Sequence, residues 1–140
     1  MVTQRIGYQL KRLQQALRMA MDTDLRAVEL TTAQYAALSI LEEQPGLSGA
    51  ALARTSFVTP QTMNQIIVGL EAEGLIARQP HPEHGRILQI SLTPAGLAKV
   101  QQAHERVLRI EAVMTAPLST AEQTQLADLL QRCAEALGDV

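Results

Sequence analysis

The amino-acid sequence predicts a mainly α-helical protein with one small β-hairpin. Of its 140 residues 46% are hydrophobic, yet Tyr8, Tyr35 and Phe57 are its only aromatic residues. Leu, Ala, Ile and Val must therefore fill the core, which is typical of helical proteins. Apolar residues also recur at three- and four-residue steps along much of the chain. An alternating apolar pattern, typical of strands, occurs near residues 75–92.

The first predicted helix covers residues 4–21, and the sequence DTD at 22–24 is expected to end it. Its apolar stripe recurs at helical spacing and consists of Ile6, Leu10, Leu13, Leu17 and Met21.

The next two helices are expected to be short and to follow each other closely. Thr31 and Gln34 match a capping box, which predicts a helix start, and Pro45-Gly46 predicts its end. This second helix should turn Tyr35, Leu38 and Leu41 inward. Ser48 then caps a third helix over 49–56, which is expected to bury Ala50, Leu52 and Ala53.

A fourth helix should start at Pro60, because Thr59 is a favourable N-cap and Pro is tolerated at the first helical position. Gly74 is expected as the C-terminal cap. Two strands follow, over 75–79 and 86–92, with a turn at 81–85. Leu88, Ile90 and Leu92 should share one face of the second strand.

Thr93-Pro94 predicts the start of a long helix that ends near Ala116, before Pro117. Ser119 and Glu122 match a capping box for a last helix, whose predicted buried residues are Leu126, Leu130, Cys133 and Leu137. The helices at the two chain ends have apolar stripes but no obvious core of their own. A two-fold homodimer in which they interlock is the economical solution.

The outer face of the helix that begins at Pro60 has the chemistry of a DNA-reading surface. With its apolar stripe inward, it presents Gln61, Gln65 and Val68 outward, flanked by Thr62 and Asn64. Gln and Asn can pair with adenine, and Thr can contact a thymine methyl group or a phosphate. Ordinary solvated faces look similar, so the prediction depends on the short helix before it and the hairpin after it. That order is typical of a winged helix-turn-helix, with this helix in the major groove of duplex DNA.

Arg86 is expected near the tip of the hairpin, where an arginine can enter the minor groove. Arg54 and Arg78 are predicted phosphate contacts. Three further residues complete the predicted DNA-binding set, namely Ser48, Thr59 and His84.

Several motifs occur in a specific order along residues 30–96: Leu30-Thr31, then Leu70-Glu71, Gly74-Leu75-Ile76 and Arg78, then Leu92-Thr93 and Gly96. In this order and spacing the chain resembles the MarR-type transcriptional regulators, and the long flanking helices extend the resemblance to essentially the whole chain. It implies a homodimer that binds a pseudo-palindromic operator as a repressor and is released by small, often aromatic or phenolic, ligands. Residues 1–140 would then form one domain, with the DNA-binding region at 31–96 and dimerisation helices at 1–30 and 97–140.

The hairpin departs from the family pattern at two positions. The family usually carries Asp-x-Arg here; Arg86 is present, but His84 stands at the Asp position and Gly85 where a second basic residue is common. Loss of the carboxylate is expected to affect the rigidity of the wing. Loss of the basic residue is expected to weaken its electrostatic attraction to DNA.

The charge distribution supports an alternative function. Net charge is −2, and residues 31–99 hold four basic and five acidic side chains. Such a balance argues against tight non-specific nucleic-acid binding but not against specific binding. The alternative is a winged-helix protein–protein interaction module with weak DNA binding.

Other site types have less support. Cys133, the single cysteine, is expected to be a buried structural residue, and the alternative is a thiol-dependent redox sensor. His81 and His84 lie in a proline-containing loop, so neither a metal nor another cofactor is predicted. No phosphate-binding loop or nucleophile motif predicts an enzyme. The charged start and the lack of an apolar run of about 20 residues predict a cytoplasmic protein without a membrane span.

Overall fold

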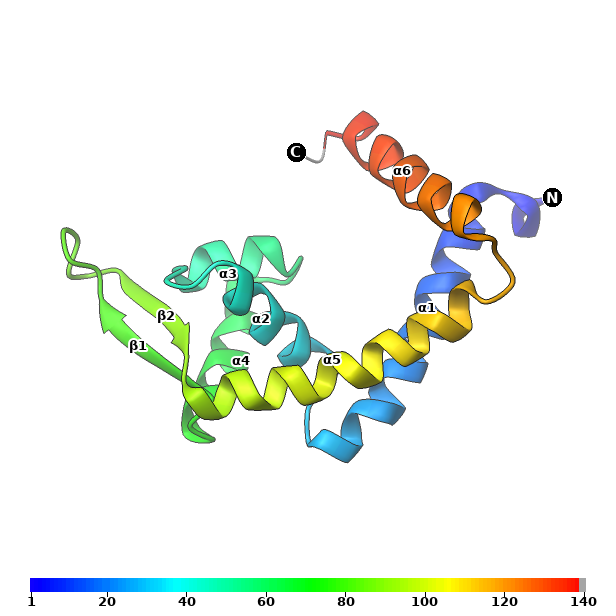
Figure 1. Cartoon of the computed structure of the whole chain (residues 1–140). Helices are drawn as coiled ribbons and strands as arrows, with labels where there is room; N and C mark the ends of the chain where they lie inside the picture. Colours follow the sequence, from blue (N-terminus) through cyan, green and yellow to red (C-terminus); the bar gives the residue numbers. More distant parts are fainter. Residues whose placement is uncertain (139–140) are drawn as a thin grey trace. The chain divides into compact units, whose positions relative to one another are not determined.

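The computed structural model describes residues 1–138 and confirms the mainly helical class with one hairpin. Two short 3-10 turns cover Val2–Gln4 and Arg26–Val28. Figure 1 shows the longer elements, which are α1 (Ile6–Leu25), α2 (Thr32–Glu43), α3 (Gly49–Thr55), α4 (Pro60–Ala72), β1 (Ile76–Pro80), β2 (Leu88–Leu92), α5 (Pro94–Thr115) and α6 (Thr120–Ala136). Within the described part of the chain, no helix is both long and apolar enough to cross a membrane.

The chain divides into two compact units, Met1–Val107 and Leu108–Val140, so that the division falls within α5. The first unit holds the buried core. Its largest fully buried side chains are Leu25, Leu38, Leu41, Leu52, Met63, Leu70, Ile90 and Val100. Side chains from α1, α2, α3, α4, β2 and the first half of α5 thus share one core. This core holds α4 and the hairpin in fixed positions.

The five predicted N-terminal caps with hydroxyl side chains, at 31, 48, 59, 93 and 119, are confirmed. The Thr93 hydroxyl accepts from the Gly96 N–H at 3.1 Å. Thr31 and Ser119 each accept from the backbone N–H three residues on and complete a capping box. Ser48 accepts from the Ala51 N–H, and Thr59 accepts from the Thr62 N–H with Pro60 in the first turn. Each bond satisfies an N–H that has no partner inside its helix, so the helix start is determined locally.

The predicted end of the first helix is wrong, because α1 continues through residues 22–24 to Leu25. The Asp22 carboxylate accepts a hydrogen bond from the Thr32 hydroxyl, and Asp24 pairs with Arg106 at 3.2 Å. Leu25 itself is fully buried. These contacts with α2 and α5 stabilise a helical turn that the local sequence disfavours.

The hairpin is antiparallel, with Ile76 opposite Leu92 and Pro80 opposite Leu88. Both strands differ slightly from the prediction, since β1 starts one residue later and β2 two residues later. Ile90 is buried and Leu92 partly buried, as expected for the inner face, but Leu88 is exposed. The Ile90 N–H donates to the Leu47 carbonyl at 2.9 Å, which ties β2 to the segment between α2 and α3.

Burial differs from the prediction in α3 and α6. Ala50 is exposed, while Leu52 and Ala53 are buried as expected. In α6 and just beyond it, Leu126 is only partly covered, and Leu130, Cys133 and Leu137 are exposed. The predicted burial of these four residues is therefore wrong for the single chain, in which none of the described residues of α6 is buried.

Candidate nucleic-acid interface

Helix α4 is fixed by its neighbours and by its own termini. It packs against α3, and Met63, Ile67 and Leu70 are buried in the core, with Ile66 partly buried. At its other end, Gly74 adopts a left-handed φ of 73°, as predicted for a residue that ends a helix. The helix therefore cannot rotate about its axis without exposing its apolar stripe.

The polar face of α4 lies outward, as predicted. The side chains of Gln61, Thr62, Asn64, Gln65 and Val68 are all exposed. Thr59 Oγ1 and Thr62 Oγ1 are 3.0 Å apart, so both hydroxyls stand together at the helix N-terminus. A row of amides beside two hydroxyls supplies donors and acceptors suited to base edges and phosphates.

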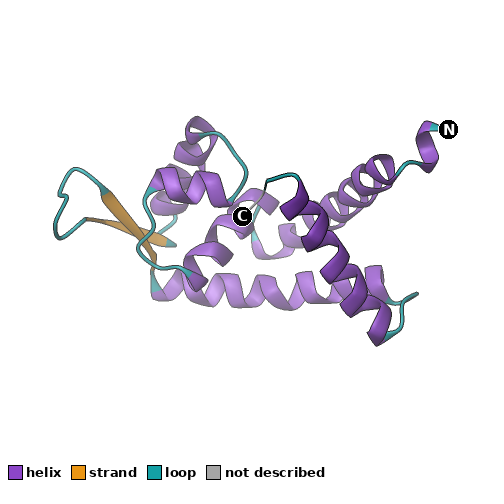
Figure 2. Cartoon of the chain, turned by 90° about the horizontal axis from the view of Figure 1, so that it is seen from above, coloured by secondary structure: helices purple, strands orange, loops and turns teal. Residues whose placement is uncertain are grey.

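Arg86 lies in the loop between β1 and β2, and its side chain is exposed. The hairpin extends beyond the helices around it (Figure 2). The loop is held by its own contacts. The His81 N–H donates to the Ile87 carbonyl at 2.8 Å, and the N–H groups of Glu83 and His84 donate to Nδ1 of His81 at 3.1 and 3.2 Å. The His81 ring thus supplies an internal brace for a loop that has no aspartate at position 84.

His84 is exposed, and its ring centroid lies 5.2 Å from that of His81. Among the described residues, no group of three or more His, Cys, Asp or Glu side chains could hold a metal ion.

Arg78 lies in an ion pair rather than on an open surface. Its Nε and Nη2 donate to the two carboxylate oxygens of Glu71 at 2.9 and 2.7 Å, a bidentate pair that joins α4 to β1. The hydrogen bond from Arg78 holds the pKa of Glu71 below its ordinary 4.5, and the same bond raises the pKa of Arg78. Of the predicted phosphate contacts, Arg54 in the last turn of α3 is exposed, whereas Arg78 uses its Nε and Nη2 to bind Glu71.

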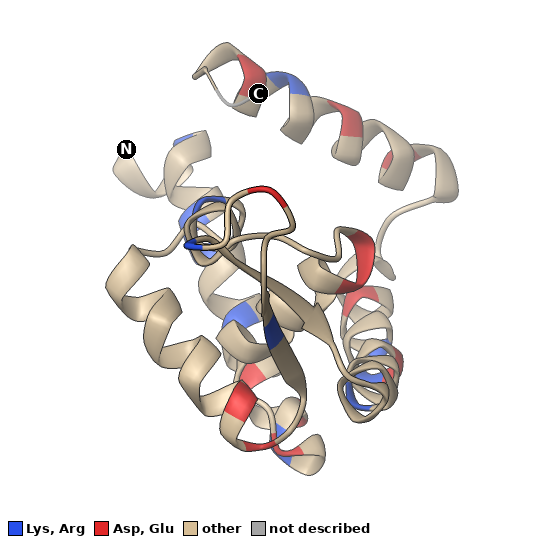
Figure 3. Ribbon diagram, turned by 90° about the vertical axis from the view of Figure 1, so that its left-hand side faces the viewer, with Lys and Arg blue, Asp and Glu red and all other residues tan. Residues whose placement is uncertain are grey.

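Figure 3 faces the hairpin and shows Lys and Arg dispersed rather than gathered in one patch. In the sequence from 60 to 92, Arg78 and Arg86 are the basic residues, against Glu71, Glu73 and Glu83. A DNA contact here would therefore depend on hydrogen bonds and shape more than on net charge.

Sequence reasoning missed a hydrogen-bonded chain between α2 and α5. His104 Nδ1 lies 2.7 Å from the Tyr35 hydroxyl, and its Nε2 lies 2.9 Å from Glu42 Oε1. His104 is partly buried between the two helices. Tyr35 and Glu42 are seven residues apart, about two helical turns, which places both on the same face of α2.

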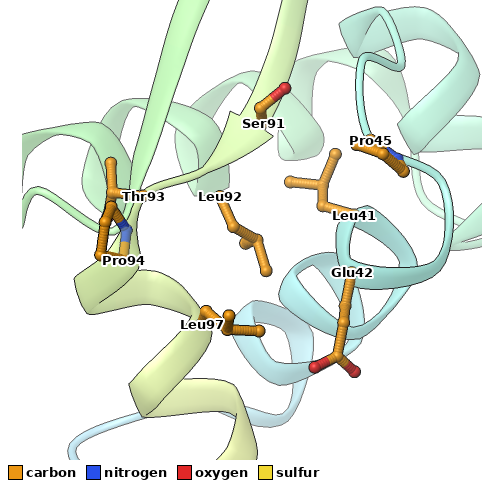
Figure 4. Close-up of a pocket in the computed structure, with 8 residues that line it drawn as sticks. All are labelled: Leu41, Glu42, Pro45, Ser91, Leu92, Thr93, Pro94 and Leu97. Atoms are coloured by element: carbon orange, nitrogen blue, oxygen red, sulfur yellow. The ribbon is translucent and has the colours of Figure 1, made fainter.

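Glu42 also borders a cavity of about 390 Å³ in the first unit, which sequence reasoning did not locate. Figure 4 shows Leu41, Leu92 and Leu97 pointing toward one another in this cavity, with the Glu42 carboxylate at one edge. The remaining lining residues are Pro45, Ser91, Thr93 and Pro94. The site is mostly apolar and carries one acidic group.

A three-helix unit whose last helix leads directly into a two-stranded wing defines a winged helix-turn-helix protein. A family model described as the MarR family matches residues 29–87. The HTH-type transcriptional repressor Rv2887 of Mycobacterium tuberculosis is 35% identical over 127 residues, 91% of this chain and 91% of the repressor. The chain therefore belongs to the MarR family of transcriptional regulators.

Solved structures of similar proteins agree with this family assignment. The transcriptional repressor CouR, bound to a 23-mer DNA duplex, matches with a TM-score of 0.87 and 28% identity, covering 95% of this chain and 94% of CouR. Rv2887 of M. tuberculosis in complex with salicylic acid matches with a TM-score of 0.76 and 34% identity, covering 92% of this chain and 96% of Rv2887. The same repressor in complex with DNA matches with a TM-score of 0.77 and 32% identity, covering 92% and 97%.

Proposed function

We propose that this protein is a dimeric, sequence-specific DNA-binding repressor that acts in the cytoplasm and releases its operator when a small molecule binds. The observation that carries this proposal is the exposed polar face of α4 beside a hairpin with an exposed Arg86. The DNA complexes of the relatives CouR and Rv2887 support it.

In this proposal α4 reads the major groove of a pseudo-palindromic operator. Gln61, Thr62, Asn64 and Gln65 would contact base edges, and Arg86 would enter the adjacent minor groove. Ser48, Arg54 and Thr59 would contact phosphates. His84 would add a contact from the wing, while Arg78 would position β1 through Glu71 rather than bind DNA strongly.

The dimer would bury apolar surface that the single chain leaves uncovered. In α1, Ile6 is 77% exposed, and Leu10 and Leu13 are also exposed. In the second unit, Val113 and Leu130 are exposed in the same way. Burial of such side chains stabilises an interface by about 25 cal/mol per Å² of apolar area. Sedimentation equilibrium tests this step: a dimer mass at micromolar concentration is expected, and a monomer at every concentration would contradict it.

The effector would bind in the cavity beside Glu42. Rv2887 is known in complex with salicylic acid, an anion at neutral pH. Here the charged lining group is a carboxylate, so an apolar ligand that donates a hydrogen bond fits better than an anion. A donor to Glu42 would also compete with His104 and weaken the link between α2 and α5.

Salicylate and salicylamide, a neutral analogue of the same shape, test the effector site. Salicylamide is expected to release the protein from DNA at a lower concentration than salicylate. In Glu42→Gln the two effective concentrations are expected to lie closer together. Release that is stronger with salicylate, and unchanged in Glu42→Gln, would exclude this cavity as the effector site.

Fluorescence anisotropy on the DNA upstream of the protein's own gene, beside scrambled DNA, tests the DNA-binding function. Wild type should bind selectively, and Arg86→Ala should weaken binding and reduce the slope of log affinity against log salt by about 1–2 per dimer. Arg26→Ala is the matched control, because it removes the same charge from an exposed position outside the reading surface.

The second candidate function is a protein–protein interaction module, which the sparse positive charge around α4 favours. Weak, unselective binding to every DNA even at low salt would support it over the repressor.

A further inference from the structure

Phe57 is the most exposed aromatic residue that the structure describes, at 85% exposure. It lies in the turn between α3 and α4, two residues before the N-cap Thr59. A large apolar side chain on a turn loses the free energy that burial would provide. The described chain offers no compensating aromatic contact for the ring.

The backbone of Phe57 is also strained. Its φ is +58°, in the left-handed region that glycine adopts freely and other residues rarely adopt. The turn itself needs this conformation: the N–H groups of Phe57 and Val58 donate back to the Arg54 and Ala53 carbonyls. Glycine would satisfy the same geometry at lower cost, so neither folding nor packing accounts for a phenylalanine here.

The position of the ring suggests a different role. Phe57 stands between the exposed Arg54 and the exposed N-terminus of α4, which is the part of a reading helix that enters the major groove. Polar groups that can bind phosphates and bases thus flank one apolar group. Apolar side chains, including Phe, contact carbon atoms of DNA at the groove, chiefly the thymine methyl group.

We propose that Phe57 is a DNA-contact residue whose ring packs against carbon atoms of the operator at the edge of the major groove, either a thymine methyl group or a deoxyribose. This inference rests on the proposed DNA-binding function. Binding to DNA then offsets both the exposure of the ring and the strain of the turn.

Three variants test the proposal by anisotropy on the selected operator. Phe57→Gly keeps the turn and removes the ring, so its melting temperature is expected to be unchanged or a few degrees higher while affinity falls roughly tenfold. Phe57→Tyr keeps the ring and is expected to bind within about twofold of wild type. Glu29→Gly is the control for relief of the strained backbone, because Glu29 has the same φ of +58° outside the α3–α4 turn; it also removes an exposed ion pair with Lys99 (3.8 Å), and it should cause no loss of affinity.

Deoxyuridine in place of thymine distinguishes the two DNA partners. If the ring contacts a thymine methyl group, the substitution weakens wild type more than it weakens Phe57→Gly; if the ring contacts deoxyribose, the substitution changes the affinity of both proteins equally. Phe57→Gly binding as tightly as wild type, or Glu29→Gly losing as much affinity, would overturn the inference while leaving the repressor function intact. Failure of wild type to bind any DNA selectively would overturn both.

Discussion

Gly96, in the first turn of α5, is the position where one added methyl group should do most damage. A Cβ built there would lie 2.0 Å from the Leu75 carbonyl oxygen and 2.9 Å from its carbonyl carbon. An ordinary C···O contact is about 3.3 Å, so the first turn of α5 would have to move away from Leu75 by about 1.3 Å. The same Leu75 carbonyl accepts the Thr93 N–H at 3.1 Å, so the shift also strains the hydrogen bond at the start of α5.

The expected cost for Gly96→Ala follows from these contacts. Overpacking costs about 1–3 kcal/mol, and loss of the hydrogen bond from the Thr93 N–H to the Leu75 carbonyl costs about 1–3 kcal/mol. The higher helix propensity of alanine offsets up to about 1 kcal/mol of this. The net loss is about 1–6 kcal/mol, which corresponds to a fall in melting temperature of roughly 3–20 °C for a chain of this size.

Thermal unfolding followed by circular dichroism measures this effect. Gly7→Ala is the matched control, because Gly7 also lies in the first turn of a helix but has nothing within 4 Å of its added Cβ. That variant should melt at or slightly above wild type. If Gly96→Ala also melts at or above wild type, the close approach of α5 to Leu75 is not a constraint on this fold.

Further predictions concern an ion pair, a cap and the cysteine. Glu71→Gln should lower the melting temperature at neutral pH. Because Arg78 lowers the folded pKa of Glu71, the stabilisation from this ion pair is full above about pH 4.5 and is lost as the pH falls through the folded pKa. The difference in melting temperature between Glu71→Gln and wild type should therefore shrink in acid. A difference that stays constant with pH would contradict this ion pair. Thr59→Ala should cost about 1 kcal/mol of unfolding free energy by chemical denaturation, whereas Thr59→Ser should cost much less. Cys133→Ser should bind DNA like wild type with and without peroxide; an oxidant response that disappears in the variant would establish the redox alternative.

The sequence was most informative where structure is determined locally. The caps at Thr31, Ser48, Thr59, Thr93 and Ser119 depend on residues three positions apart, and all five formed as predicted. The outward face of α4 followed from the spacing of its apolar residues, because a helix has one period.

Contacts between distant residues could not be predicted in the same way. α1 continues through residues 22–24 because partners from positions 32 and 106 stabilise it. Tyr35 and His104 are 69 residues apart, and no pattern in one sequence pairs them. The stripe of α6 was recognised, but periodicity does not reveal what covers a face.

Selection of binding sites from a random duplex library, with wild type and Gln65→Ala in parallel, tests the central claim most directly. Wild type should enrich two inverted half-sites about 10 base pairs apart, centre to centre. Gln65→Ala should relax the preference at one position in each half-site and leave the others unchanged. A motif that is identical for both proteins would show that Gln65 reads no base, and no enriched motif at all would contradict α4 as a reading helix.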